Sequence, residues 1–239
     1  RAMKTEFLLA AASVLVLSAC QTAAPQSEPA MLAPVAEEAD LATRAGAPLF
    51  EGMGDFHRPV TTASDDAQKY FDQGMVLAFG FNHAESIRSF RAAQKLDPEC
   101  AMCFWGEALA TGPNINITSK GKAVMSPEDR AAAYAAIQKA IALKDTASPA
   151  ERDLIDALAT RYSADFEAER APQDIAWAEA MGRYVATYPD DDDAAAIYAE
   201  AWMDTMPWDY WSADGEPKPE TVAVIDALES ILARSPEHP

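Results

Sequence analysis

The stretch that decides the fold is AQKYFDQGMVLAFGFNHAESIRSFRAAQKLDPEC, residues 67–100. Its apolar and small residues recur at helical spacing on both sides of the turn at 80–82. The stretch therefore predicts one helix over about 65–80 and a second over about 83–96. Leu96-Asp97-Pro98 closes the second helix, because proline does not continue a helix. Two helices joined by so short a turn pack as an antiparallel hairpin.

The same closing signal returns three times further along the chain, at intervals of 44 to 47 residues: 143–145, 188–189 and 235–236. Apolar stripes at helical spacing lie between these points; one of them is Ala133, Ile137, Ala140 and Leu143. The sequence predicts further helix pairs at 100–111 with 127–144, 149–164 with 172–187, and 192–205 with 219–234. No run alternates with the period of two that is typical of strands.

The first window resembles the tetratricopeptide repeat family at seven positions: Tyr70, Gly74, Leu77, Ser86, Phe90, Ala93 and Pro98. The resemblance implies that small residues, here Gly74 and Ser86, lie where the two helices meet. The sequence departs from the family pattern at Gln73, where leucine is usual, and at Ser86, where alanine is usual. Its repeats are also longer than the family's. The implied fold is an all-α, tetratricopeptide-like solenoid of antiparallel helix hairpins with long within-hairpin loops.

Five further segments resemble a group of bacterial tetratricopeptide proteins of unassigned biochemical role. The resemblance spans about residues 50–239, and it implies an architecture without implying an activity. The segments are 54–60 (GDFHRPV), 81–85 (FNHAE), 96–102 (LDPECAM), 112–116 (GPNIN) and 207–211 (PWDYW).

The N-terminus has the pattern of an export signal. Lys4 precedes a short apolar run over 7–17, which is too short to span a bilayer permanently. The run ends in Leu17-Ser18-Ala19-Cys20, which resembles the lipobox of bacterial lipoproteins. The resemblance implies that residues 1–19 are removed and that Cys20 carries the lipid, and Gln21 implies sorting to the outer membrane. The alternative is an ordinary secretory signal cut near Ala19.

Residues 20–48 are rich in Ala, Pro, Glu, Gln and Ser, and we expect them to form a flexible tether. Residues 49–239 then form the helical-repeat domain. A solenoid usually ends in a polar capping helix, and none precedes Pro239, so we expect the sequence to be truncated at its C-terminus.

The formal net charge of −19 makes nucleic acid an unexpected partner, because a polyanion repels phosphates. The densest acidic run, 190–193, is typical of a helix start, where acidic residues complement the helix dipole. It lacks the alternating ligands and turn glycine of a calcium loop.

The candidate binding residues lie in the within-hairpin turns, which hold the insertions and share one edge of such an array. One group there is Asn82, His83, Asn114 and Asn116, which we expect to lie close together. The other is Trp208, Tyr210 and Trp211. Aromatic surfaces beside amides suit a peptide, a sugar or another small polar ligand. The alternatives are that Asn82 caps a helix, that the loop amides bind their own backbone, and that the tryptophans pack in the core.

Cys100 and Cys103 form a C-x-x-C pair at a helix start. Three interpretations remain open: a disulfide, two buried thiols, or a metal or redox site. Two thiolates are half of a zinc site, and His57 or His238 flanks a between-hairpin turn from which it would complete the set.

The sequence contains three histidines and none of the common nucleophile, phosphate-binding or zinc-protease motifs, so we do not expect an enzyme or a bound cofactor. The expected function is a lipid-anchored helical-repeat protein of the cell envelope, at the outer membrane facing the periplasm, that binds another envelope protein or peptide. The alternative is a lipoprotein that binds a metal or small molecule through Cys100 and Cys103, or through the edge formed by Asn82, His83 and Asn116.

Overall fold

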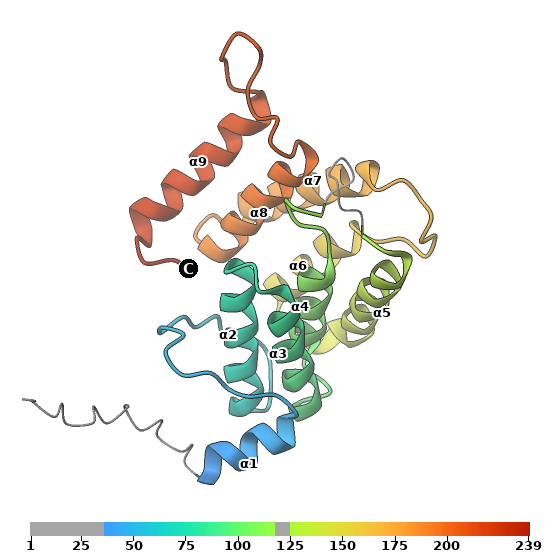
Figure 1. The fold of residues 1–239 in the computed structure, drawn as a ribbon, viewed down its shortest axis with the longest axis vertical. Helices are drawn as coiled ribbons and strands as arrows, with labels where there is room; N and C mark the ends of the chain where they lie inside the picture. The colour runs from blue at the N-terminus through green and yellow to red at the C-terminus, as the bar shows by residue number, and fades with distance from the viewer. Residues whose placement is uncertain (1–35, 118–124) are drawn as a thin grey trace, which may run out of the picture. The chain divides into compact units, whose positions relative to one another are not determined.

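The computed structural model describes residues 36–117 and 125–239, and within these ranges the chain is all-helical (Figure 1). The predicted all-α class is therefore confirmed. No strand is present in the described ranges, where only two isolated bridges occur, Asn114 with Ile117 and Trp211 with Pro217. The helices are α1 (Ala36–Ala45), α2 (Asp65–Phe79), α3 (His83–Leu96), α4 (Ala101–Thr111), α5 (Pro127–Leu143), α6 (Pro149–Ala159), α7 (Ala171–Thr187), α8 (Asp192–Thr205) and α9 (Pro219–Arg234), with a short 3-10 turn at Lys144–Thr146.

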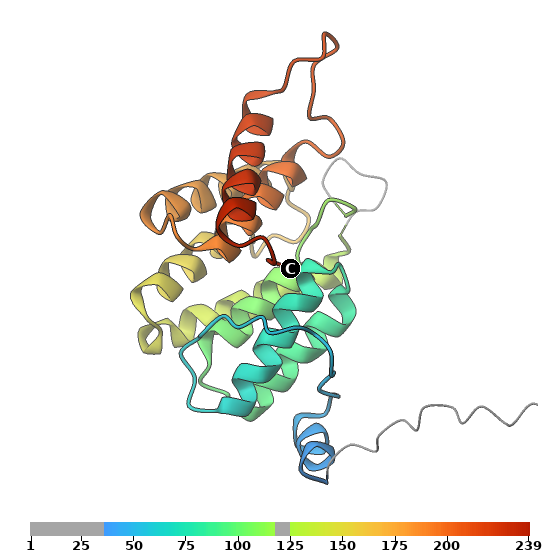
Figure 2. The same cartoon turned by 90° about the vertical axis from the view of Figure 1, so that its left-hand side faces the viewer.

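Consecutive helices pack side by side from α2 onward, as the two views of the chain show for α2 with α3, α4 with α5, and α8 with α9 (Figure 2). The within-hairpin loop from α4 to α5 and the loop from α8 to α9 are long, as the sequence predicts. None of the described helices is long and apolar enough to cross a lipid bilayer.

Polar caps fix where the helices begin. The side chains of Ser64, Ser126 and Asp191 each accept a hydrogen bond from a backbone N–H in the first turn of their helix. Ser148 and Glu151 form the predicted capping box at the start of α6. These short-range interactions explain why the sequence locates the helix starts accurately.

The centre of the first hairpin is the ring of Phe90 on α3, which packs between two glycines. A Cβ atom at Gly74 of α2 would lie 2.7 Å from the Phe90 ring, and one at Gly106 of α4 would lie 2.3 Å from it. The Ser86 hydroxyl donates a 2.7 Å hydrogen bond to the Gly74 carbonyl oxygen. Gly74 and Ser86 therefore lie at the helix contact, as predicted.

The predicted tether of residues 20–48 is wrong at its C-terminal end. Residues 36–45 form α1, and Leu41, Ala45 and Ala47 are buried. The hydroxyl of Tyr70 on α2 donates to the Ala47 carbonyl oxygen at 2.7 Å. The folded part therefore includes residues 36–48, which the sequence assigns to the tether. The remainder of the tether and the expected signal peptide, with Cys20, lie outside the described residues.

Gln73, which departs from the family pattern, is buried and holds the chain that follows α1. Its amide accepts from the Phe50 N–H at 2.6 Å and donates to the Pro48 carbonyl oxygen and the Ser89 hydroxyl. A leucine would remove all three of these hydrogen bonds, which explains the polar residue.

Residues 57–63 form an extended segment, here called the strap, that contacts the beginnings of several helices. The Thr61 N–H and hydroxyl both donate to Glu151 at the start of α6 at 2.6 Å. The Ala63 N–H donates to Asp97 at 2.9 Å, just before α4. Arg58 reaches Asp191 and Asp193 at the start of α8. The strap therefore connects the segments at which α4, α6 and α8 begin.

Candidate functional site

Four helices and the turn after α6 surround a small cavity of about 20 Å³, here called the inner pocket. The C-terminal ends of α2 and α4, the start of α3, the turn after α6 and the middle of α8 all contribute residues to it. Its polar lining is His83, Asn114, Arg161 and Glu200, and its apolar lining includes Met75, Phe79, Leu109 and Ile197. Residues more than a hundred positions apart in sequence thus meet at one point.

His83 is the least satisfied polar group of the inner pocket. Both of its ring nitrogens are buried and neither has a hydrogen-bond partner. Burial lowers the pKa of this imidazole, so the ring is neutral at pH 7, with one donor and one acceptor. Because Asn114 lines the same cavity, the predicted proximity of His83 and Asn114 is confirmed.

The other two amides of the predicted group do not join the inner pocket. Asn82 is exposed and its side chain makes no capping hydrogen bond with α3. Asn116 is exposed, and its backbone N–H donates to the Asn114 side-chain oxygen at 2.9 Å. Of the four predicted residues, the cavity therefore brings together His83 and Asn114, and Asn82 and Asn116 lie outside its lining.

A buried charged network that the sequence does not predict lies behind the inner pocket. Arg161 donates to Asp204 at 2.6 Å and lies 3.8 Å from Asp174. Arg170 donates to Asp174 at 2.6 Å and to the Arg161 carbonyl oxygen at 2.7 Å. All four side chains are at least 95% buried. Such groups are rarely buried unless they are paired, and here each cation has an acid.

Burial changes the protonation of the acids in this region. It raises the pKa of Asp204 to about 7, although Arg161 opposes the shift. Burial also raises the pKa of Glu200, which has no hydrogen bond or salt bridge within the described part of the chain. A signal for the network exists in the sequence: Asp174 and Asp204 extend the apolar stripes of α7 and α8, where a charge is unexpected.

The loop between α8 and α9, residues 206–218, displays the predicted aromatic residues. Trp208 is 75% exposed and Trp211 is 52% exposed, so the alternative of core packing is wrong for both. Tyr210 is half-buried, and its hydroxyl is buried without a partner. The loop projects beyond the helices in both views (Figures 1 and 2).

Hydrogen bonds hold this loop in one shape. The Tyr210 carbonyl oxygen accepts from the Lys218 N–H at 3.1 Å and from the Thr221 hydroxyl at 2.6 Å. Trp208 has a φ of 61°, in the left-handed region that a bulky side chain rarely adopts. Backbone strain of this kind persists only where neighbouring contacts impose it, and it concentrates at functional sites.

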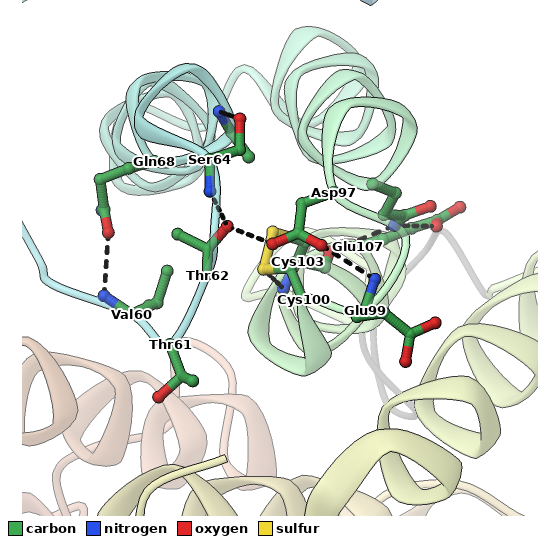
Figure 3. The surroundings of a disulfide bond; sticks show 12 residues. Val60, Thr61, Thr62, Ser64, Gln68, Asp97, Glu99, Cys100, Cys103 and Glu107 are labelled. Atoms are coloured by element: carbon green, nitrogen blue, oxygen red, sulfur yellow. Dashed lines mark hydrogen bonds between the residues drawn. A yellow bond between two sulfur atoms is a disulfide. The ribbon is translucent and has the colours of Figure 1, made fainter. Parts of the chain in front are cut away.

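Cys100 and Cys103 form a buried disulfide at the start of α4 (Figure 3). Figure 3 shows it beside Asp97, which accepts from the Thr62 hydroxyl of the strap. Of the three interpretations left open by the sequence, the structure therefore has the disulfide. A disulfide offers no thiolate to a metal ion.

The suggested histidine partners of a cysteine metal site are bound elsewhere. His57 contacts Asp72 of α2 through a 2.8 Å interaction, and His238 contacts Asp193 at 3.0 Å. No group of three or more His, Cys, Asp or Glu side chains within residues 36–117 and 125–239 is placed to hold a metal ion. The prediction of a metal site built from Cys100, Cys103 and His57 is therefore wrong for this disulfide-bonded form.

A wider cleft of about 800 Å³ lies between residues 53–59, the turn from α7 to α8 and residues 235–239. The principal charged side chains of this cleft form ion pairs with one another. Arg58 lies 2.6 Å from Asp191 and 2.8 Å from Asp193. Although burial opposes the effect, Arg58 keeps the pKa of Asp191 below its ordinary value. These groups close the strap onto α8 and leave few of the cleft's charges free for a ligand.

Comparison with known proteins adds no relative. No protein-family model matches the sequence, and neither the curated proteins nor the solved structures contain a match.

Proposed function

We propose that this chain is a helical-repeat protein of the cell envelope that binds a protein or peptide through the loop at 206–218. The observation that carries the proposal is the pair of exposed tryptophans, Trp208 and Trp211, on a loop fixed by hydrogen bonds. Tryptophan is among the residues that contribute most to binding when a partner covers it. A loop that is already ordered loses little conformational entropy on binding.

The proposal also includes how the helices are arranged. We take the helix pairs to be a tetratricopeptide-like solenoid, which the side-by-side packing of consecutive helices and the long within-hairpin loops support. Insertions on one face of a repeat protein are often its binding face. The formal charge of −19 favours a partner other than nucleic acid.

The first prediction concerns the two tryptophans. A random peptide library selected on the immobilised chain should yield peptides whose affinity falls at least tenfold in the Trp208→Ala/Trp211→Ala variant, since each side chain acts as an interface anchor. Fluorescence polarisation with the labelled peptides measures the affinity. The thermal midpoint should stay unchanged, because both side chains are exposed.

Phe50→Ala is the matched control, because Phe50 is also an exposed aromatic residue, 40% accessible, and lies far along the chain from the loop. It should leave the affinity unchanged. Equal binding by the double variant and the parent chain would refute the assignment of the loop.

The second prediction concerns the membrane anchor, which we place at Cys20 after removal of residues 1–19. The support is the match of residues 17–20 to a lipobox behind a short apolar run. Each buried methylene of a lipid chain contributes about 0.8 kcal/mol to membrane binding. Cys20→Ser should therefore move the protein from the membrane to the soluble periplasmic fraction, as measured by immunoblotting of fractionated cells. Unchanged membrane fractionation of the variant would contradict the anchor.

A further inference from the structure

The helix α9 is covered on one side only within the described part of the chain. Each helix from α3 to α8 packs between the helix that precedes it and the helix that follows it, whereas α9 packs extensively against α8 alone among the described helices. Both views show α9 at the outer end of this row of helices (Figures 1 and 2). Its face away from α8 is therefore open to a further helix.

Apolar side chains continue from the covered side of α9 onto its open side. The buried residues of the helix are Thr221, Val224 and Ile231. A second set of apolar residues, spaced three or four apart and therefore on one helix face, is half-buried or exposed; this set, here called the α9 stripe, is Val222, Ile225, Leu228 and Leu232. The same spacing is typical of the anchor residues of helices that bind to one another.

Two acidic residues border the α9 stripe. Asp226 follows Val222 by four residues and Glu229 follows Ile225 by four, so both acids lie beside the stripe on the helix surface. Both are exposed, and neither forms an ion pair with another described residue. Two copies of the chain joined through this stripe would bring the acids together, and like charges across an interface oppose binding. Lysine or arginine at the edges of a partner would instead complement them.

A helix matches this face better than an extended peptide does. Extended partners bind by adding a strand to the edge of a sheet, and the backbone groups within α9 are already hydrogen-bonded in the helix. A second helix needs no backbone bonds to α9, because the side-chain ridges of one helix pack into the grooves of the other.

We propose that the α9 stripe docks an amphipathic helix of another protein, which presents apolar residues at helical spacing with lysine or arginine along their edges. Burial of the stripe supplies the attraction, and the pairing of the partner's cations with Asp226 and Glu229 supplies the preference for a basic helix. The surface does not include Trp208 and Trp211, so it stands or fails independently of the proposed function.

The experiment uses a labelled amphipathic peptide of leucine and lysine, with its leucines at helical spacing, and a scrambled peptide of the same composition. Fluorescence polarisation should show saturable binding to the purified chain, at least tenfold tighter for the amphipathic peptide than for the scrambled one. Since the two peptides carry the same charge, the difference excludes a general attraction to an acidic protein. Equal affinities would overturn the proposal.

Substitutions within the stripe test where the peptide binds. Val222→Ser/Leu232→Ser should weaken binding at least tenfold and leave the thermal midpoint unchanged, because both side chains are exposed. Phe50→Ser/Ile175→Ser is the matched control, since it replaces two exposed apolar residues outside α9 and should leave the affinity unchanged. Equal weakening by the two double variants would overturn the assignment.

A second pair of variants tests the preference for a basic partner. Asp226→Asn/Glu229→Gln should weaken binding several-fold, whereas Glu167→Gln/Glu179→Gln removes two exposed acids elsewhere and should not. Equal effects of these two variants would overturn the charge complementarity.

Hydrogen–deuterium exchange and sedimentation distinguish the remaining outcomes without a variant that must fold. The bound amphipathic peptide should slow amide exchange along α9, and the free chain should sediment as a monomer. Protection confined to the loop at 206–218 would overturn this proposal and leave the proposed function standing. A dimer that the peptide dissociates would overturn it in favour of a second copy of the chain as the occupant.

Discussion

Replacing Arg161 with methionine is expected to lower the free energy of unfolding by about 3–5 kcal/mol. Arg161 is 2% exposed, donates to Asp204 at 2.6 Å and lies 3.8 Å from Asp174. Methionine fills a similar volume without the charge, so the loss comes from the acids that remain buried without their cation. Urea denaturation monitored by circular dichroism measures the change.

Arg88→Met is the matched control for this prediction. Arg88 also pairs with an acid, Glu85 at 2.6 Å, but its side chain is 54% exposed. Exposed pairs contribute about 0–1 kcal/mol, so the control should be nearly neutral. Adding Asp204→Leu to Arg161→Met should recover part of the stability, since it removes the orphaned acid. A loss below about 1 kcal/mol for Arg161→Met would show that the network is solvated.

Replacing Gly106 with alanine is expected to lower the free energy of unfolding by about 1–3 kcal/mol, although alanine is the better helix former. The new Cβ would lie 2.3 Å from the Phe90 ring, which is buried and also packs on Gly74. The ring therefore has little room to move away, and α4 must shift from α3.

Gly182→Ala on α7 separates this clash from the general effect of a methyl group in a helix. Its nearest contact would be Tyr198 Cε2 at 3.3 Å, on a half-buried side chain that moves more easily. We expect a neutral or slightly stabilising effect, measured by the same denaturation. Equal effects of the two substitutions would contradict the close packing of α3 on α4.

The parts of the fold that the sequence predicts well depend on local interactions. Gly74, Ser86 and Phe90 lie within one 34-residue window, and the capping box at Ser148 and Glu151 spans four residues. The approach of His83 to Asn114 is also predictable, because both follow the C-terminal end of a first helix in neighbouring hairpins. Short-range spacing therefore carries this information.

The charged network was not predicted because spacing does not identify a distant partner. Arg161 and Asp204 are 43 residues apart, and nothing in either neighbourhood indicates which acid binds which cation. The helix α1 was missed for a different reason. Within residues 40–48 the buried side chains are Leu41, Ala45 and Ala47, which are too few apolar residues to give a periodic stripe.

Neither the bonding of the two cysteines nor the exposure of the two tryptophans follows from the residue types alone. A C-x-x-C pair at a helix start is compatible with thiols, a metal or a disulfide, and the backbone around Cys100 and Cys103 brings the sulfurs into a bond. Tryptophan is usually well buried, so the exposure of Trp208 and Trp211 follows only from the hydrogen bonds that hold the loop away from the helices.

The measurement that tests the proposed binding function most directly is hydrogen–deuterium exchange of the chain with and without a peptide from the library selection. The account predicts that the bound peptide slows amide exchange in the loop at 206–218 and the adjoining end of α9. Protection confined to other helices, with exchange in the loop unchanged, would contradict the assignment of the partner site to Trp208 and Trp211.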